Sequence, residues 1–261
     1  MFDYRFIQLS FMASLLVSII SSIIGTFIVL RKMTSVTGSI SHSAFGGLGI
    51  GLLLGINPLY AAIPFTIAVA GIFAWFKKSL KIGEESLLSI IWAFGMSLGI
   101  ILMNFKKGYT GEVLGYLFGS ILAVTLSDIF LMASIALLTA ILFFIFFREF
   151  VLLSFDEEFA LLKGINTKLL DLLFYSLTAL AVVSLIKAAG VLVVIAFISV
   201  PPLIARRFTD NIKLIILISF ILNILFSTAG IILSFYLDFP TGPSMVMTSL
   251  IIFFAVSLIK R

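Results

Sequence analysis

The sequence predicts an all-α polytopic membrane protein, and two observations predict this fold class: the composition and the length of the apolar runs. Of the 261 residues, 62% are hydrophobic and 11% are charged, whereas a soluble domain carries about 25% charged residues. Residues 9–30 and 214–235 contain no Lys, Arg, Asp or Glu, and about 20 apolar residues suffice to cross the hydrocarbon core of a bilayer. We therefore expect a single transmembrane domain over residues 1–261, surrounded by lipid in the cell (inner or plasma) membrane.

The apolar runs and the residues that interrupt them predict about nine transmembrane helices, or eight or ten if two neighbours merge or a further segment crosses. The predicted spans lie at residues 7–30, 39–56, 58–76, 86–104, 126–147, 169–187, 189–205, 213–236 and 243–259. Residues 114–124 are apolar but too short to cross, and Gly115 and Gly119 interrupt them. We interpret this stretch as a short re-entrant segment, whose backbone needs hydrogen-bond partners from protein or water.

The distribution of Lys and Arg predicts an N-terminus outside and a cytoplasmic C-terminus, because cytoplasmic loops are enriched in these residues. With nine crossings, only Arg5, Lys106, Lys107 and Lys187 of the 17 basic residues fall outside. The thirteen on the cytoplasmic side are Arg31, Lys32, Lys77, Lys78, Lys81, Arg148, Lys163, Lys168, Arg206, Arg207, Lys213, Lys260 and Arg261. This bias accounts for the net charge of +5, so the basic balance does not indicate a nucleic-acid partner.

His42 is the only histidine of the chain, and it lies beside Ser39 and Ser41 on an otherwise apolar predicted helix. Ionisable groups at membrane depth are costly and usually face a bundle interior or a cavity. Neutral imidazole is also a common ligand of zinc and related metals. The three side chains are therefore candidates for a metal translocation pathway. The alternative is a structural histidine bonded to a neighbouring helix, with the serines bonded to their own helix.

Residues 156–164 form an acidic segment that ends in glycine on the predicted cytoplasmic side. Acids in the first turn, a lysine in the last turn and a glycine stop predict a short amphipathic helix. Its candidate residues are Asp156, Glu157, Glu158, Phe159, Leu162, Lys163 and Gly164. The apolar face, with Phe159 and Leu162, is either a docking surface for a soluble partner or a lid packed on the chain's own helix ends.

Two further features interrupt the apolar sequence near predicted span ends. Pro201 and Pro202 remove backbone donors just before a basic helix end, which predicts either a hinge or gate of a permeation path or a plain helix terminator. Asp238 lies in the tight connection between the last two predicted spans. Most such loops are only turns, but a carboxylate at an external mouth also attracts cations.

Several motifs of catalysis are absent from the sequence. It contains no G-x-x-x-x-G-K-[ST] phosphate loop, no H-E-x-x-H and no G-x-S-x-G motif. It also contains no cysteine, which excludes disulfides and thiolate metal sites. We therefore expect a protein that is not itself an enzyme and that carries no bound cofactor.

Taken together, these segments resemble the membrane permease subunit of the ABC importers for zinc, manganese and iron(II). The resemblance covers essentially the whole chain and depends on the order and spacing of its motifs. The matching stretches lie at residues 25–33, 41–44, 51–61, 116–125, 163–165, 189–193, 201–207 and 240–244.

The resemblance implies a homodimer around a central pathway, two cytoplasmic ATPase subunits and an extracytoplasmic metal-binding protein. ATP would bind to the ATPase subunits, in agreement with the missing phosphate loop. Residues 156–164 look like the coupling helix that docks on the ATPase. The transported ion would be divalent, with zinc expected first and manganese or iron(II) as alternatives.

The chain departs from the family pattern along the implied pathway. That pattern often places an Asp one turn before the histidine, and this position is Gly38 here. The Gly-Asp pair of some members is Gly119-Ser120. Only His42 carries over, so one histidine from each protomer, with water or Ser41, would form the site. A weak site suits a path that must release its ion.

Two other classes of protein fit the sequence less well than the permease. An ion-gradient-driven secondary transporter would need acids in mid-helix, but all 12 acids fall near predicted span ends. An intramembrane hydrolase is supported only by His42 beside serines, and neighbours on one helix are poorly placed as nucleophile and base.

Overall fold

The structure is a computed structural model that describes residues 4–77, 83–105, 115–119 and 121–258. Within these ranges every regular element is a helix, which confirms the all-α prediction. The elements are α1 (Arg5–Leu30), α2 (Thr34–Leu54), α3 (Pro58–Phe76), α4 (Glu84–Asn104), η1 (Ile121–Ala123), α6 (Leu126–Ile145), α7 (Phe147–Phe155), α8 (Glu157–Leu162), α9 (Thr167–Ala189), α10 (Val191–Ala205), α11 (Ile212–Leu237) and α12 (Thr241–Leu258).

Each of the nine predicted spans coincides with one helix, and no described helix boundary differs from its prediction by more than five residues. Seven of these helices are long and apolar enough to cross a membrane. The other two are α10, which is apolar but has 15 residues, and the glycine- and serine-rich α2, which has 21. The chain is therefore a multi-pass membrane protein, and the number and sidedness of its crossings stay predictions.

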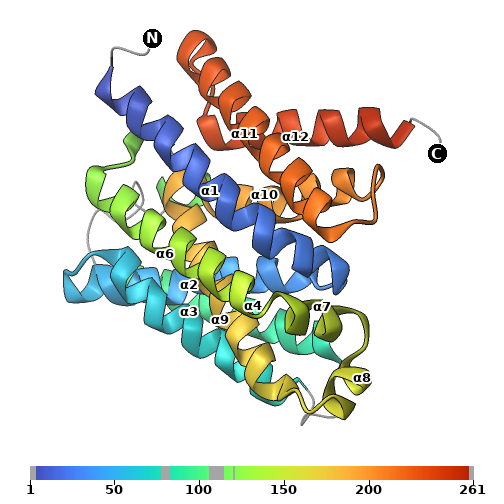
Figure 1. Cartoon of the computed structure of the whole chain (residues 1–261). Helices are drawn as coiled ribbons and strands as arrows, with labels where there is room; N and C mark the ends of the chain where they lie inside the picture. The colour runs from blue at the N-terminus through green and yellow to red at the C-terminus, as the bar shows by residue number, and fades with distance from the viewer. Residues whose placement is uncertain (1–3, 78–82, 106–114, 120, 259–261) are drawn as a thin grey trace.

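Three helices form the interior of the bundle. The membrane-spanning windows of α1 and α9 are each 72% buried, and α10 exposes only Leu192, Ile195 and Leu203. Figure 1 shows α1 running between two groups of helices, with α2, α3 and α4 on one side and α11 and α12 on the other. The hydrophobic core therefore lies around α1, α9 and α10.

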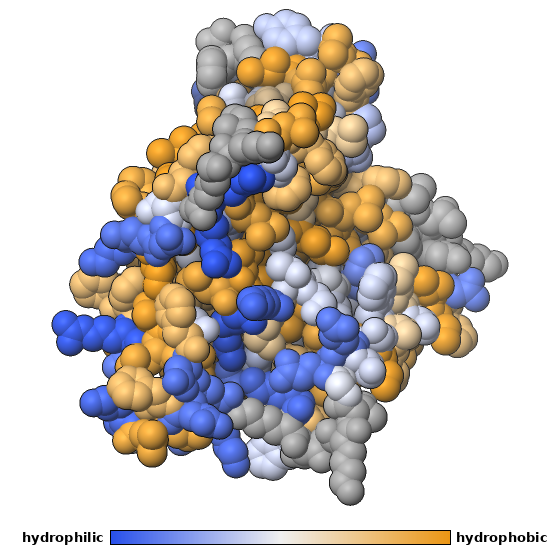
Figure 2. All heavy atoms as spheres, turned by 90° about the vertical axis from the view of Figure 1, so that its right-hand side faces the viewer, coloured by the Kyte–Doolittle hydropathy of each residue, from blue (hydrophilic) through white to orange (hydrophobic). Residues whose placement is uncertain are grey.

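The outer helices expose large apolar side chains. Phe94 of α4, Phe130 and Phe144 of α6 and Phe254 of α12 are 61–87% exposed, as expected of surfaces that face lipid. Figure 2 views the end of the molecule where α1 and α12 end and α7 and α8 lie. Hydrophilic side chains gather over the middle and lower part of this view. This is the end that the Lys and Arg bias predicts to be cytoplasmic.

The stretch predicted as re-entrant is described except at its residues 114 and 120, and it contains one helical turn and η1. Glycines make it possible for this segment to lie against two helix ends. A Cβ on Gly119 would lie 2.1 Å from the backbone nitrogen of Gly190, between α9 and α10. A Cβ on Gly242 of α12 would lie 2.3 Å from the carbonyl oxygen of Phe118. Protein thus lies against the segment at Phe118 and Gly119, and helices provide part of the surroundings that an irregular backbone in a membrane requires.

Candidate functional site

His42 lies on α2, where its imidazole stacks on the indole of Trp92 from α4. The ring centroids are 4.6 Å apart and the ring planes are inclined by 18°. The Nδ1 atom of His42 is buried and has no hydrogen-bond partner among the described residues. The predicted structural alternative, a histidine bonded to a neighbouring helix, therefore finds no support at this nitrogen.

The two serines beside His42 are turned into the protein. Ser41 is fully buried, and its hydroxyl donates to the carbonyl of Gly38 at 2.9 Å, which is the expected bond to its own helix. Ser39 is 3% exposed. A Cβ on Gly38 would lie 3.3 Å from Cδ1 of Ile195 on α10. Of the predicted group, only His42 combines a ring nitrogen without a hydrogen-bond partner with partial exposure of the side chain.

Asp238 lies apart from His42. It is exposed, caps the C-terminal end of α11 and has a left-handed backbone with φ of 54°. Its helix packs on α1, α10 and α12, whereas α2 packs chiefly on α3 and α4. Among the described residues, no three His, Cys, Asp or Glu side chains are grouped so that they could hold a metal ion. The described part of the chain therefore offers one imidazole and no group of three such side chains.

The acidic segment forms the predicted short helix, α8. Asp156 caps it by accepting a hydrogen bond from the backbone N–H of Phe159 at 2.9 Å, and Gly164 ends it with a φ of 80°. Ala160 is fully buried against the protein, whereas Phe159 and Leu162 are 44% and 85% exposed. An exposed apolar face favours the docking surface over the lid.

Of the other residues in this segment, Glu158 is exposed and Glu157 is partly buried. The ammonium group of Lys163 lies 5.4 Å from the centre of the Phe159 ring. Charged side chains thus surround the apolar face of α8.

Pro201 and Pro202 lie inside α10 and are buried. A proline at 202 cannot donate to the carbonyl of Ile198, four residues earlier. That carbonyl points at α1: a Cβ on Gly25 would lie only 2.0 Å from its oxygen. The prolines thus coincide with the closest approach of α10 to α1. α10 continues for three residues beyond Pro202 and ends at Ala205, so both the hinge or gate and the helix terminator stay predictions.

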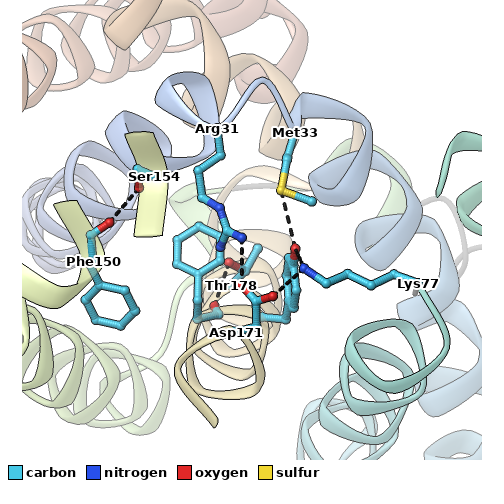
Figure 3. Close-up of polar contacts among 9 residues, drawn as sticks. Arg31, Met33, Lys77, Phe150, Ser154, Asp171 and Thr178 are labelled. Carbon is cyan, nitrogen blue, oxygen red and sulfur yellow. Dashed lines mark hydrogen bonds and ion pairs between the residues drawn. The ribbon is translucent and has the colours of Figure 1, made fainter. Parts of the chain in front are cut away.

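A buried group of charges at the end of α1 was not predicted as a site (Figure 3). Asp171 of α9 accepts from Arg31 at 2.6 Å through Oδ1 and pairs with Lys77 through Oδ2. The three side chains are 3–9% exposed. Lys77 also donates to the hydroxyl of Tyr175 at 3.2 Å. We call these four residues the Asp171 cluster.

Aromatic rings and a thioether surround the Asp171 cluster. The guanidinium carbon of Arg31 lies 4.9 Å from the centre of the Phe174 ring, and the Tyr175 hydroxyl donates to the sulfur of Met33 at 3.3 Å. Cation–π contacts of this kind gain strength where water is excluded. The cluster is thus held from several directions.

The Asp171 cluster joins the ends of several helices. Arg31 follows α1, Lys77 follows α3, and Asp171 lies in the second turn of α9. Only residues 163–166 separate α8 from α9, and only residues 31–33 separate α1 from α2. A short route through the buried Asp171 cluster therefore leads from α8 to the helix that carries His42. The sequence did contain a signal for this cluster: Asp171 lies in an apolar helix and could pair with basic residues. Arg31 and Lys77 were instead attributed to the enrichment of Lys and Arg on the cytoplasmic side.

The chain matches known proteins over nearly its full length. The model of one family, described as the ABC 3 transport family, matches residues 3–260. The chain belongs to the ABC 3 transport family.

Several ABC 3 family relatives carry informative names. The manganese transport system membrane protein MntC of Listeria innocua is 31% identical, covering 98% of this chain and 91% of the relative. The high-affinity zinc uptake system membrane protein ZnuB of Buchnera aphidicola is 32% identical, covering 94% and 95%. PsaBC from Streptococcus pneumoniae, solved in complex with a Fab, superposes with a TM-score of 0.89 at 26% identity, covering 99% of this chain and 93% of that chain.

Membership of the ABC 3 family confirms the predicted resemblance. The named relatives are membrane proteins of metal transport systems. Because one is named for manganese and another for zinc, their names do not indicate which metal ion this chain would transport.

Proposed function

We propose that this chain is the permease subunit of an ATP-driven importer of divalent metal ions, with zinc as the first expectation and manganese or iron(II) as alternatives. The observation that carries the proposal is the family match over residues 3–260. Relatives named for zinc uptake and manganese transport match over nearly the whole chain. The chain translocates the ion, and hydrolysis of ATP belongs to a separate subunit.

The working assembly is a homodimer of this chain with two cytoplasmic ATPase subunits and an extracytoplasmic metal-binding protein. The central pathway lies between the protomers, and His42 of each contributes one imidazole. Since one chain supplies no cluster of three ligands among its described residues, the second protomer completes the site, together with water or the Ser41 hydroxyl. Asp238 attracts cations at the external mouth.

The ATPase docks on the exposed face of α8, where Phe159 and Leu162 are accessible. Closure of the ATPase pair displaces α8 and the start of α9. The Asp171 cluster passes this displacement to the ends of α1 and α3, and the three-residue link after α1 passes it to α2. Pro201 and Pro202, where α10 approaches α1, form the gate that opens and closes the path.

Reconstitution tests this proposal. The chain, its ATPase and its metal-binding protein are placed in liposomes, and uptake of radioactive zinc and manganese is followed with and without ATP. We expect uptake that requires ATP hydrolysis and is lost in Leu162→Ser. Leu237→Ser, an exposed apolar residue at the opposite end, is the matched control. Uptake that persists when hydrolysis is blocked would overturn the proposal.

The buried acids argue against an ion-gradient-driven transporter. Asp128 and Asp171 are the only acids among the described residues that are less than 9% exposed. Each is paired with a cation: Asp128 with Lys187 at 3.8 Å, and Asp171 with Arg31 and Lys77. A carrier of protons or sodium would need an acid free to take up and release the ion, and each of these carboxylates is already paired inside the chain.

A further inference from the structure

We infer that Trp92 is the positioning residue of His42: its indole holds the imidazole in the orientation in which it meets the transported ion. The inference depends on the proposed function, because it assigns Trp92 a role only through a pathway histidine. The inference goes beyond the proposed function because it adds Trp92, which lies on α4 rather than α2 and acts without contacting the ion.

The geometry of the two rings is the first support. A centroid distance of 4.6 Å and an inclination of 18° describe a stacked pair, which restricts rotation of the imidazole about its last side-chain bond. Trp92 is 45% exposed, so burial of the indole does not by itself account for its place. Trp92 is the only aromatic ring stacked on the imidazole of His42 among the described residues.

The crossing of α2 and α4 imposes this stacking. A Cβ on Gly95 would lie 2.5 Å from Cα of Ser43, and one on Gly99 would lie 2.3 Å from the carbonyl oxygen of Phe45. These glycines four residues apart let the two helices touch through their backbones, as small residues do in membranes. Trp92 lies one turn before Gly95, and His42 is next to Ser43, so the two rings meet where the backbones are closest.

The second support is that Nδ1 of His42 makes no hydrogen bond among the described residues. A metal-binding histidine almost always donates its other ring N–H to a carboxylate or carbonyl, which orients the ring and raises its basicity. His42 lacks this bond at Nδ1, although the atom is buried. Stacking on Trp92 provides the orientation without raising the basicity. The result is an oriented but weak ligand, which suits an ion that must leave.

The choice of aromatic residue has a physical reason. An imidazole that binds a divalent metal carries positive charge, and the face of an indole attracts positive charge more strongly than that of any other side chain. Leucine would fill similar space without this attraction, whereas phenylalanine would retain part of it. These two substitutions therefore separate stacking from simple bulk.

The first experiment measures metal uptake per ATP hydrolysed by the reconstituted complex. We expect Trp92→Leu to lower this ratio roughly tenfold, the lower limit for loss of a supporting residue at a metal ligand, and Trp92→Phe to restore most of it. Phe94→Leu, an exposed aromatic residue on the same helix, is the matched control and should transport normally. A Trp92→Leu complex that transports like wild type overturns the inference.

A double variant decides whether Trp92 acts through His42. If it does, His42→Gln with Trp92→Leu transports no worse than His42→Gln alone, compared at the uptake that His42→Gln retains above background; additive losses overturn the inference. Normal uptake by His42→Ala would remove the proposed role of His42 and, with it, the role of Trp92. Failure of Trp92→Leu alone to change uptake, with His42→Ala inactive, would remove only the present inference.

Fluorescence gives a readout that a merely structural role would not move. The chain has two tryptophans, so Trp75→Phe leaves Trp92 as the only indole in the permease. Co²⁺ lies between Fe²⁺ and Ni²⁺ in its affinity for nitrogen ligands, and it quenches nearby indoles. With the ATPase in a tryptophan-free form, saturable quenching that His42→Ala abolishes supports the inference. Quenching that is the same without His42 overturns it.

Discussion

The Asp171 cluster and His42 are two polar regions in the same apolar bundle, and they are built in opposite ways. In the cluster, one carboxylate binds two cations, one cation binds a tyrosine, and that tyrosine binds a methionine sulfur. His42 has a single ring contact and a buried nitrogen without a partner. The cluster lies where helices end, whereas His42 lies within a helix.

This difference teaches which polar group is part of the scaffold and which is available for binding. Charges taken out of water require partners, because desolvation costs several kcal/mol for each ion. The cluster pairs each of its charges inside the chain, although Nη1 of Arg31 is buried without a hydrogen-bond partner among the described residues, and it holds helix ends together. A neutral imidazole tolerates the unmet bond at Nδ1 more cheaply, so His42 can present its ring to an ion without a supporting hydrogen bond at that nitrogen.

Loss of the shared carboxylate should have the largest effect. Asp171→Ala leaves Arg31 and Lys77 buried without their anion, and breaking a buried pair in this way costs about 3–5 kcal/mol. Chemical unfolding of the purified permease in detergent measures the change. Asp210→Ala, an exposed acid in a loop, is the control and should change stability by less than about 0.5 kcal/mol. Equal stability of the two variants would contradict the scaffold role of the cluster.

The α2–α4 crossing should be the next most sensitive, because the two helices touch there through their backbones. Gly95→Ala brings a methyl group to 2.5 Å from Cα of Ser43, and overpacking costs about 1–3 kcal/mol. Gly71→Ala, whose new methyl meets only Cδ1 of Leu172 at 3.7 Å, should be neutral or stabilising. The same unfolding measurement compares the two; a neutral Gly95→Ala would show that the helices separate easily.

Removal of the imidazole should affect stability little and transport strongly. His42→Ala loses one stacked aromatic pair, worth about 0.5–1.5 kcal/mol, and leaves no charge unpaired. Unfolding in detergent should show a loss of about 1 kcal/mol, while ATP-dependent metal uptake in liposomes falls to background. A loss as large as that of Asp171→Ala would mean that His42 belongs to the scaffold, and the contrast between the two regions would fail.

The sequence predicted the two regions unequally. The helices around them follow from long apolar runs. α3 begins and ends at the predicted residues, and its start is marked by the Asn57 cap and by Pro58 in the first turn. His42 was found because an ionisable residue is conspicuous in an apolar stretch. Its neighbour Trp92 was not, since an aromatic residue on a membrane helix carries no signal by itself.

The Asp171 cluster escaped prediction for a different reason. Arg31, Lys77 and Asp171 come from parts of the chain up to 140 residues apart, and each one alone resembles an ordinary charge at a helix end. Only the packing of α9 against α1 and α3 brings them together. Sequence periodicity gives the buried face of a helix but not its partner, so such a cluster needs the fold.

A second ion pair provides the smallest and most discriminating test of the contrast. Lys187 and Asp128 join α9 to α6 at 3.8 Å, but the lysine side chain is 29% exposed, and Asp128 also accepts from the backbone and hydroxyl of Thr125. Lys187→Ala should therefore cost less than about 1 kcal/mol, as is typical of pairs that water reaches, and added salt should reduce even this. Stability in detergent at low and high salt measures both effects. If Lys187→Ala were as costly as Asp171→Ala, shared burial and multiple partners would not be what distinguishes the cluster, and any ion pair between helices would serve equally well.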